Sequence, residues 1–353
     1  MKPVRVFTTY PPEDASRRLR IDPLVAALRR EGRRVTVHTL LTPAMFRDKN
    51  DPRRRPGVGA KLLLRLAIRC FRLAAVGSSE QVLVHREAFP FFTPLAERWL
   101  ARRGAVVVLD VDDALYVEPT HGRDWRSRLR SAAAYDGVLK SVDLVLAGSP
   151  ALCRRAAALG TPASLTYTVP PLAARTLHRE PASRPTLVWT GSQSTLGSLL
   201  EVLDDALEVC EETDGRLIVL GGPNAAELPR HPRLHAERWS QEGELRALRS
   251  SWLGLMPLPD TEWEAGKSAY KLLLYLFAGL PVAASPVGMN QLFADAPGVT
   301  LVGPGDWSTA IRTALRTAAE EDGSGIRAWA EALVRPEEQL ARTIAFFSSP
   351  ESG

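Results

Sequence analysis

The chain has 353 residues, 45% of them apolar and 24% charged, which excludes a disordered protein and leaves room for two hydrophobic cores. Its formal net charge of +5 suits an anionic ligand but does not by itself indicate nucleic-acid binding. The three cysteines, Cys70, Cys153 and Cys210, are widely spaced, which predicts neither a disulfide framework nor a zinc site and fits a reducing cytoplasm.

The first half of the chain alternates short apolar runs with helical patterns. The apolar runs predict strands at 4–8, 35–40, 82–84, 106–109 and 144–147. Such alternation is typical of a parallel sheet with helices on both faces. Residues 1–172 are therefore predicted to form one Rossmann-like domain, and the proline-rich segment 173–185 to form a hinge.

A second α/β set follows the hinge, predicted as a domain over 186–325. It has strand patterns at 187–190, 217–220, 253–256 and 282–285, and helical patterns at 196–210 and 269–278. Two doubly wound domains enclose a cleft, and in open α/β sheets ligands bind beside the carboxyl ends of the strands. The last segment, 326–353, is an amphipathic helical stretch broken at Pro336, and we expect it to pack back across the hinge.

The sequence shows no targeting or membrane-spanning pattern. Its first residues enter a strand pattern directly, without the apolar core and cleavage site of a signal peptide. Lys271 and Pro281 interrupt the best apolar run, so it falls short of the roughly 20 residues that a spanning helix needs. We therefore expect a cytoplasmic protein that is soluble or membrane-peripheral.

The segment 262–285 carries the clearest chemical signal. Ser268 is a plausible helix N-cap, Lys267 precedes it and Lys271 follows one turn later. Two cations and the free backbone N–H groups of a helix start would converge there, which predicts a cradle for a diphosphate. The alternative is a capped helix with solvated lysines.

This segment resembles the donor-binding half of retaining, family-4-type GT-B glycosyltransferases. The similarity lies in Gly-Lys-Ser-x-x-Lys at 266–271 and in Tyr-Leu-x-Ala-Gly-Leu-Pro-Val-x-Ala-Ser-Pro-Val-Gly at 275–288. Residues 187–195 resemble the glycine-serine loop of that family and 303–315 its closing helix, while 85–87 with 109–115 resemble a bacterial branch with a DxDD strand end. The resemblance spans nearly the whole chain.

This resemblance implies a GT-B fold of two Rossmann-like domains facing across a cleft. It further implies transfer of a sugar from a nucleotide diphosphate sugar to a hydroxyl acceptor with retention, and neither a metal ion nor another cofactor. The acceptor could be a cell-surface glycan, a lipid-linked molecule or a natural product.

The chain departs from the family at two glutamates that lie eight residues apart. The aligned positions are Gly266 and Leu274, and neither is acidic. Glu262 or Glu264 could replace the first glutamate, and we prefer Glu264 as a catalytic-site residue because it is nearer to Lys267. The alternative for Glu264 is an exposed loop residue.

Other donor contacts are predicted at strand ends of the second domain. Gly191 and Ser192 follow a strand and precede a helix that Ser194 or Thr195 could cap, so their backbone can approach a phosphate closely. Gly222 ends the next strand in the same crevice. Trp239 lies where the family holds the nucleotide base, although it could equally be a core residue.

Asp110, Asp112 and Asp113 place three carboxylates at the end of one apolar strand, where their mutual repulsion requires partners. They could bind a metal ion, orient a sugar and act in catalysis, or cap the next turn. Because the resembling enzymes need no metal, we favour catalytic-site roles for Asp112 and Asp113 and a structural role for Asp110.

Basic residues mark the acceptor-side domain. Arg20, at a helix start, and Arg86, after a strand, are candidates for acceptor or phosphate contacts; a solvated arginine is the alternative for Arg20.

Residues 61–73 form a helical pattern with one basic face, made of Lys61, Arg65, Arg69 and Arg72, and an apolar face made of Leu62, Leu63, Leu66, Cys70 and Leu73. This helix could contact an anionic membrane, or it could simply have a solvated basic face. Nucleic-acid binding is not predicted, because no aromatic residues interleave with the charges.

Two other functions remain open on the sequence alone. An inverting GT-B transferase could use Asp112 or Asp113 as its general base. A non-catalytic GT-B-like protein could bind nucleotide sugar and assist another transferase, which the missing glutamates make credible.

Overall fold

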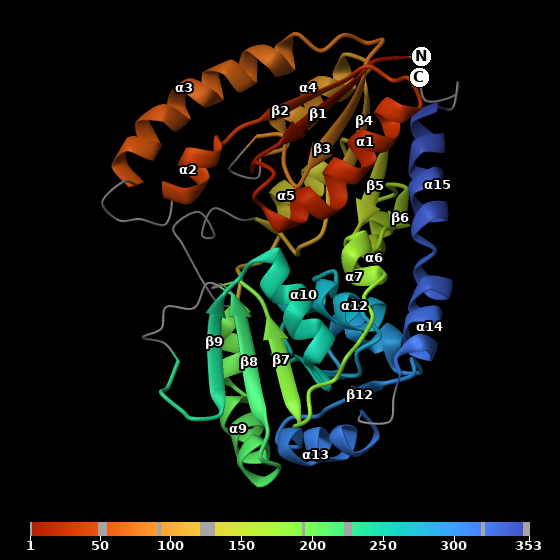
Figure 1. The fold of residues 1–353 in the computed structure, drawn as a ribbon. Coiled ribbons are helices and arrows are strands. Elements are labelled where there is room, and N and C mark those ends of the chain that lie inside the picture. Colours follow the sequence, from red (N-terminus) through yellow and green to blue (C-terminus); the bar gives the residue numbers. More distant parts are fainter. Residues whose placement is uncertain are drawn as a thin grey trace.

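Two parallel α/β halves make up the protein (Figure 1). The structure is a computed structural model that describes residues 2–48, 55–89, 93–120, 131–192, 195–221, 228–318 and 322–348. Within these ranges, no helix is both long and apolar enough to cross a bilayer.

The first sheet has six parallel strands in the order β2-β1-β3-β4-β5-β6. Its strands are β1 Val4–Thr8, β2 Val35–Thr39, β3 Gln81–His85, β4 Val106–Val111, β5 Leu144–Ala147 and β6 Ala163–Leu165. The register places Thr8 beside His85 and His85 beside Asp110, so polar side chains line up where β1, β3 and β4 end. This row forms one wall of the site.

Helices cover both faces of the first sheet. They are η1 Arg17–Ile21, a short π-helical turn, then α1 Asp22–Arg30, α2 Pro43–Asp48, α3 Arg55–Ala74, α4 Leu95–Arg102, α5 Ala132–Leu139, α6 Pro150–Ala158 and α7 Leu172–Arg175. Leu73 of α3, Leu100 of α4, Tyr135 of α5 and Leu152 of α6 share one apolar core. The opposite face packs on α1.

The second sheet also has six parallel strands, in the order β12-β11-β10-β7-β8-β9. They are β7 Thr186–Thr190, β8 Arg216–Gly221, β9 Leu234–Arg238, β10 Leu253–Met256, β11 Val282–Ala284 and β12 Val299–Leu301. The helices of this half are α8 Leu196–Leu200, α9 Leu203–Glu212, α10 Gln241–Ser250, α11 Glu262–Ala265, α12 Tyr270–Phe277, the 3-10 helix η4 Gly288–Phe293, α13 Trp307–Ala318 and α14 Ser324–Val334.

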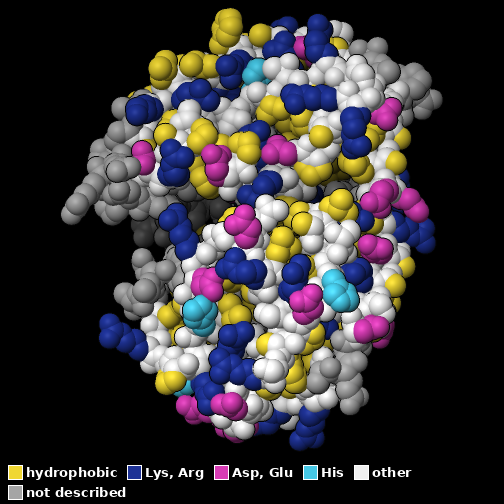
Figure 2. Space-filling view, viewed as in Figure 1, with side chains coloured by type: hydrophobic (Ala, Val, Ile, Leu, Met, Phe, Trp, Pro, Cys, Tyr) yellow, Lys and Arg dark blue, Asp and Glu magenta, His cyan; other side chains and the backbone are white. Residues whose placement is uncertain are grey.

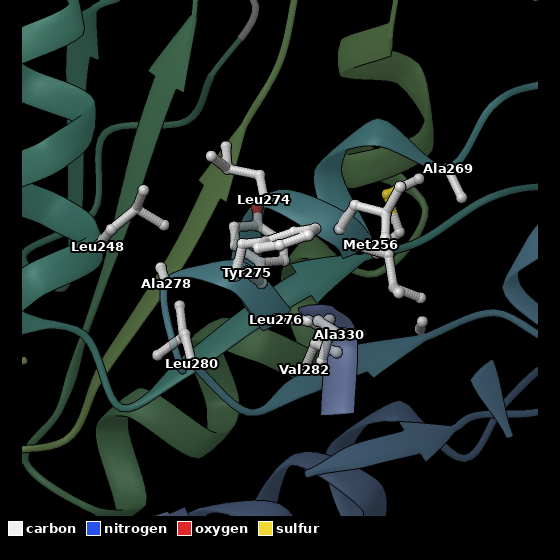
Figure 3. Packing of buried hydrophobic residues seen from close by; sticks show 14 of the residues in the cluster. Leu248, Met256, Ala269, Leu274, Tyr275, Leu276, Ala278, Leu280, Val282 and Ala330 are labelled. Atoms are coloured by element: carbon white, nitrogen blue, oxygen red, sulfur yellow. The ribbon is translucent and has the colours of Figure 1, made fainter. Parts of the chain in front are cut away.

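Helix α12 is anchored in the core of the second half (Figure 3). Its residues from Leu272 to Phe277 are fully buried. The Tyr275 hydroxyl accepts a hydrogen bond from the backbone N–H of Thr190 at 3.2 Å and donates to the Leu255 carbonyl at 3.3 Å. These contacts fix α12 relative to the ends of β7 and β10.

The last helix, α15 Pro336–Ser348, returns to the first half (Figure 1). Arg335 ends α14 in the left-handed region, at φ 45°, and Pro336 then begins α15. Phe347 is buried with α1 residues in the core of the first half, and the Gln339 side chain bonds both backbone groups of Tyr167. The boundaries 1–172, 173–185, 186–325 and 326–353 themselves stay predictions.

All predicted strands are present, whereas the sequence does not predict β6, β9 and β12. These three are edge strands and have no fully buried apolar run. The helix predicted at 196–210 is two helices, α8 and α9, and the helix predicted at 269–278 is the shorter α12.

Candidate active site

The Lys271 ammonium is the most unusual charge at the ends of the second sheet. Its Nζ is buried and has no hydrogen-bond partner among the described residues. It lies 4.5 Å from the ring centroid of Trp189, the penultimate residue of β7. Burial, with a further contribution from the charge of Lys267, lowers the pKa of Lys271 to about 7. A buried cation without a counter-ion is costly, so this position favours an anion.

Lys267 and Glu264 form an ion pair beside Lys271. The Lys267 Nζ lies 2.5 Å from the Glu264 Oε2. Glu264 is buried in α11, whose first turn is capped by the Thr261 hydroxyl, so the alternative of an exposed loop glutamate is wrong. Glu264 thus pairs directly with Lys267, and it acts on Lys271 only as a nearby negative charge that burial outweighs.

The expected cap at Ser268 is absent. Helix α12 begins after Ala269, which is left-handed at φ 49°, and no side chain caps it. The turn before it is shaped by the first half: the Ser149 hydroxyl donates to the Gly266 carbonyl at 3.0 Å, and Ser268 is buried. The first N–H groups of α12 still lack intrahelical acceptors, as at any helix start.

The loop after β7 packs tightly around glycine. A Cβ at Gly191 would lie 2.5 Å from the Trp189 ring, and one at Gly221 would lie 2.4 Å from the Gly191 carbonyl oxygen. The Thr195 hydroxyl bonds the Ser192 carbonyl instead of a helix N–H, so the expected threonine cap is wrong. Ser194 and Gly222 lie outside the described residues.

Glu244, in the first turn of α10, is a buried carboxylate that the sequence does not single out. Its Oε1 accepts from the Thr190 hydroxyl at 2.7 Å and from the Trp239 indole N–H at 3.0 Å. Burial raises the pKa of Glu244. Trp239 is 38% exposed, which overturns its interpretation as a core residue, and the Arg18 guanidinium lies 5.2 Å from its ring centroid.

A cavity of about 430 Å³ lies between the two halves. Its lining includes Trp239, Glu244 and Tyr270 from the second half and Arg18 and Leu24 from the first. Its size and mixed lining are those of a small-molecule site.

In the first half, Arg20 is a structural brace. Its guanidinium donates to both carboxylate oxygens of Asp110, at distances of 2.7 to 3.1 Å, and to the Thr168 hydroxyl at 3.0 Å. It also donates to the carbonyls of Thr166 and Leu146. Asp110 is bonded to His85 Nδ1 at 2.8 Å. The alternative of a solvated Arg20 is wrong. Arg20 and Asp110 line the cavity, but a hydrogen bond from Arg20 to a ligand would require it to break an internal bond.

Asp112 and Asp113 are held by Arg86. The Arg86 Nε lies 2.9 Å from Asp112 Oδ1, and a terminal nitrogen lies 2.9 Å from Asp113 Oδ2. The Ser16 hydroxyl donates to Asp112 at 2.5 Å. Burial alone raises the pKa of Asp112, but the charges of Arg86 and His85 outweigh it and hold that pKa far below its usual value. Asp112 is therefore a fixed anion at neutral pH.

Arg86 adopts a left-handed backbone at φ 66°, which is uncommon for a residue other than glycine. Its backbone N–H donates to the Asp110 carbonyl at 2.8 Å, which fixes the side chain over the strand end. Within the described ranges, no three His, Cys, Asp or Glu side chains are grouped so that they could hold a metal ion.

Asp112 and the lysine turn meet across the cleft at Gly148. A Cβ at Gly148 would lie 3.2 Å from the Asp112 Cβ and 3.1 Å from the Ser268 Cβ. A Cβ at Gly266 would lie 2.4 Å from the Ala114 Cβ, so a glutamate does not fit there in this arrangement. The candidate residues of the two halves thus lie close together where the halves pack, and Asp112, Lys267 and Lys271 are not among the residues that line the 430 Å³ cavity.

Of the four residues of the basic face predicted on α3, Lys61 is exposed and Arg72 is half-buried, whereas Arg65 and Arg69 are not solvated. Arg69 is buried and donates to the carbonyls of Thr8 and Ala88 at 2.6 and 2.8 Å. Arg65 donates to the carbonyls of Thr39 and Leu40 at 2.6 and 2.9 Å. Buried carbonyls at strand ends require donors, and these arginines supply them. The helix therefore turns these two basic side chains inward.

No family model and no curated protein matches the chain. Solved structures do. TarM has a TM-score of 0.61 at 10% identity over 81% of this chain, which spans 58% of TarM. A UDP-forming α,α-trehalose-phosphate synthase from Burkholderia xenovorans has a TM-score of 0.63 at 13% identity, over 98% of both chains. The lipopolysaccharide outer core galactosyltransferase WaaB has a TM-score of 0.61 at 12% identity, over 99% of this chain and 100% of WaaB. The chain has the GT-B fold of two Rossmann-like domains.

Proposed function

We propose that this protein is a glycosyltransferase that moves a sugar from a nucleotide diphosphate sugar to a hydroxyl acceptor. The observation that carries the proposal is the buried Lys271 ammonium without a hydrogen-bond partner among the described residues. The likeness in fold to a UDP-forming synthase and to a galactosyltransferase supports it.

The donor diphosphate would bind between the β7 loop and the start of α12. Lys271 and Lys267 supply positive charge, and Gly191, Ser192 and Ser268 supply close backbone and hydroxyl groups, with Thr195 at the margin. As the bond from the sugar to the phosphate lengthens, negative charge grows on the diphosphate. Fixed cations stabilise that state more than the ground state, which lowers the barrier.

We infer retention of configuration. A general base works best when its pKa is near the operating pH, and the pKa of Asp112 lies far below it. This disfavours the inverting reaction with Asp112 as base and leaves Asp113 as the base of the competing inverting mechanism. In the retaining reaction, the acceptor oxygen bonds to the anomeric carbon as the bond to phosphate breaks, and the leaving phosphate takes the acceptor proton. Asp112, Asp113 and Glu264 would orient sugar or acceptor hydroxyls.

The nucleoside would occupy the cavity beside Trp239. Its ring is partly exposed and held by Glu244, which makes it a stacking surface for a base. Leu274, where related enzymes carry a ribose-binding glutamate, is buried in the core. Of the carboxylates that line the cavity, Asp110, Glu244 and Glu337, Glu244 is the one bonded to Trp239. We assign the ribose hydroxyls to Glu244.

The proposed partners are a nucleotide sugar and an acceptor on a cell-surface glycan, a lipid-linked molecule or a natural product. The proposed reaction needs no metal ion, other cofactor or nucleic acid. We place the protein in the cytoplasm, and at a membrane surface where the acceptor is lipid-linked.

A screen of nucleoside diphosphates and their sugars by thermal shift, followed by an assay of transfer and donor hydrolysis, tests this function. Lys271→Met is expected to lower turnover with the best donor at least about a hundredfold, because transition-state charge loses its counter-ion. The matched control is Lys140→Met, an exposed lysine on the first half. Unchanged turnover in Lys271→Met would refute the phosphate assignment, and binding without any turnover would favour a non-catalytic protein.

A further inference from the structure

The outer face of α3 is apolar and unusually exposed. Leu63, Leu64 and Phe71 are 71%, 65% and 76% exposed. Ala67, Cys70 and Ala74, at helical spacing between and after them, are exposed as well. Arg65 and Arg69 point inward together with Leu62, Leu66 and Leu73, so a second set of apolar side chains on the helix is left facing outward. Large exposed apolar patches of this kind mark interaction sites.

Helix α4 ends close to the end of α3 and also exposes apolar and basic side chains. It packs on the same side of the first sheet as α3, and the Arg103 Nε donates to the Val76 carbonyl just after α3. Its exposed residues are Leu95, Arg98, Trp99, Ala101 and Arg102. The Arg103 guanidinium lies 5.5 Å from the Trp99 ring centroid. The name α3–α4 surface is used for Lys61, Leu63, Leu64, Ala67, Cys70, Phe71, Leu95, Arg98, Trp99 and Arg102.

The charge on this surface has one sign. Residues 55–79 contain no acidic residue, and the one acidic residue in 93–104 is Glu97, which is buried. Figure 2 shows hydrophobic and basic side chains together along the edge of the molecule where α3 lies. Apolar side chains ringed by lysine and arginine match the interface of an anionic bilayer, where apolar groups insert and cations bind headgroup phosphates.

We propose that the α3–α4 surface docks the protein on an anionic lipid bilayer, with Leu63, Leu64 and Phe71 inserted and with Arg98 and Arg102 on headgroup phosphates. A second copy of the chain fits less well, because two such surfaces would bring like charges together. The surface is built without any residue of the cleft, so the proposal goes beyond the donor chemistry and does not depend on it.

Vesicle sedimentation tests the proposal with the full chain. Wild type should bind vesicles of phosphatidylcholine with phosphatidylglycerol, bind phosphatidylcholine alone weakly, and lose binding as salt rises. Leu64→Ser and Phe71→Ser should each weaken binding about tenfold or more, since each removes one inserted apolar side chain. The matched control is Leu292→Ser, which removes a leucine that is 45% exposed on the second half and should bind like wild type.

A second readout follows insertion itself. Cys70 is exposed on the surface, Cys153 is half-buried and Cys210 is buried, so Cys153→Ser allows a polarity-sensitive fluorophore to be placed at Cys70. Its emission should shift to the blue on anionic vesicles. The proposal fails if wild type does not bind these vesicles, or if Leu292→Ser weakens binding as much as Phe71→Ser. It also fails if sedimentation without lipid finds a dimer that Phe71→Ser dissociates.

Discussion

The two walls of the cleft hold their charges in opposite ways. On the first half, Asp110, Asp112 and Asp113 are bonded to Arg20, His85 or Arg86. On the second half, the Lys271 ammonium is buried with no hydrogen-bond partner within the described part of the chain. Both arrangements lie at the carboxyl ends of parallel strands. The paired charges of the first half hold their side chains in place without a ligand. The buried ammonium of Lys271, which lacks such a partner, indicates a binding site for an anion.

Removing a partner from the paired charges of the first half should have the largest effect on stability. Arg86→Gln removes the partner of Asp112 and leaves a buried anion, so we expect the free energy of unfolding to fall by about 3–5 kcal/mol. Denaturant unfolding measures this change. Arg246→Gln, which removes an exposed partner of Glu237, is the control and should cost less than about 1 kcal/mol. Equal losses in the two variants would mean that the wall is not held by Arg86.

Replacing the unpaired charge of the second half should raise the free energy of unfolding instead of lowering it. Lys271→Met removes a buried cation, so we expect the ligand-free protein to gain about 2 kcal/mol, by analogy with the gain when buried ion pairs are replaced by apolar side chains. Stability gained with loss of activity is typical of a functional site. A loss of stability in this variant would show that Lys271 already has its counter-ion.

The free energy of unfolding of wild type should depend on pH because of the buried Lys271 amine. The folded protein releases the Lys271 proton near pH 7, and the unfolded chain holds it to about 10.5. The unfolded state therefore binds more protons between these values, and the contribution of Lys271 to unfolding free energy should rise with pH across that window. The difference between wild type and Lys271→Met isolates this contribution. A difference that does not vary with pH would contradict the lowered pKa.

The nucleoside assignment can be sharpened separately from the phosphate assignment. Trp239→Ala should lower the affinity for the best nucleoside diphosphate by about 10- to 100-fold, the range expected for one stacked base. The affinity for inorganic pyrophosphate should stay unchanged. Trp99→Ala, which removes a tryptophan outside the cleft, serves as the control. The assignment is contradicted if calorimetry shows that Trp239→Ala lowers the affinities for the nucleoside diphosphate and for pyrophosphate equally.

The sequence predicts the central features of the fold because buried parallel strands are continuous apolar runs. It misses β6, β9 and β12, because edge strands are partly exposed and lack that signal. It also predicts α3 with its basic face turned outward, whereas the fold turns Arg65 and Arg69 inward. That orientation depends on the carbonyls of Thr8, Thr39 and Ala88, which lie far away in the chain and are brought under α3 only by the fold.

The candidate site was predictable only where charge and spacing coincide. Lys267 and Lys271 stand out because cations at a helix start are unfavourable without an anion. Glu244 does not stand out, because an acidic residue in the first turn of a helix is ordinary. Its burial and its bonds to Thr190 and Trp239 come from tertiary packing. The cap expected at Ser268 fails because Ser149 and Gly148 of the first half shape the turn before α12.

Calorimetry of nucleoside diphosphate binding at about pH 8.5, in buffers of different ionisation enthalpy, tests most directly whether Lys271 is the counter-ion of the donor phosphates. At that pH the free ammonium has largely lost its proton, since its pKa is about 7. An anion at the site restores the charged form, so wild type should take up about one proton on binding and Lys271→Met none. Tight binding by wild type without proton uptake would contradict the account.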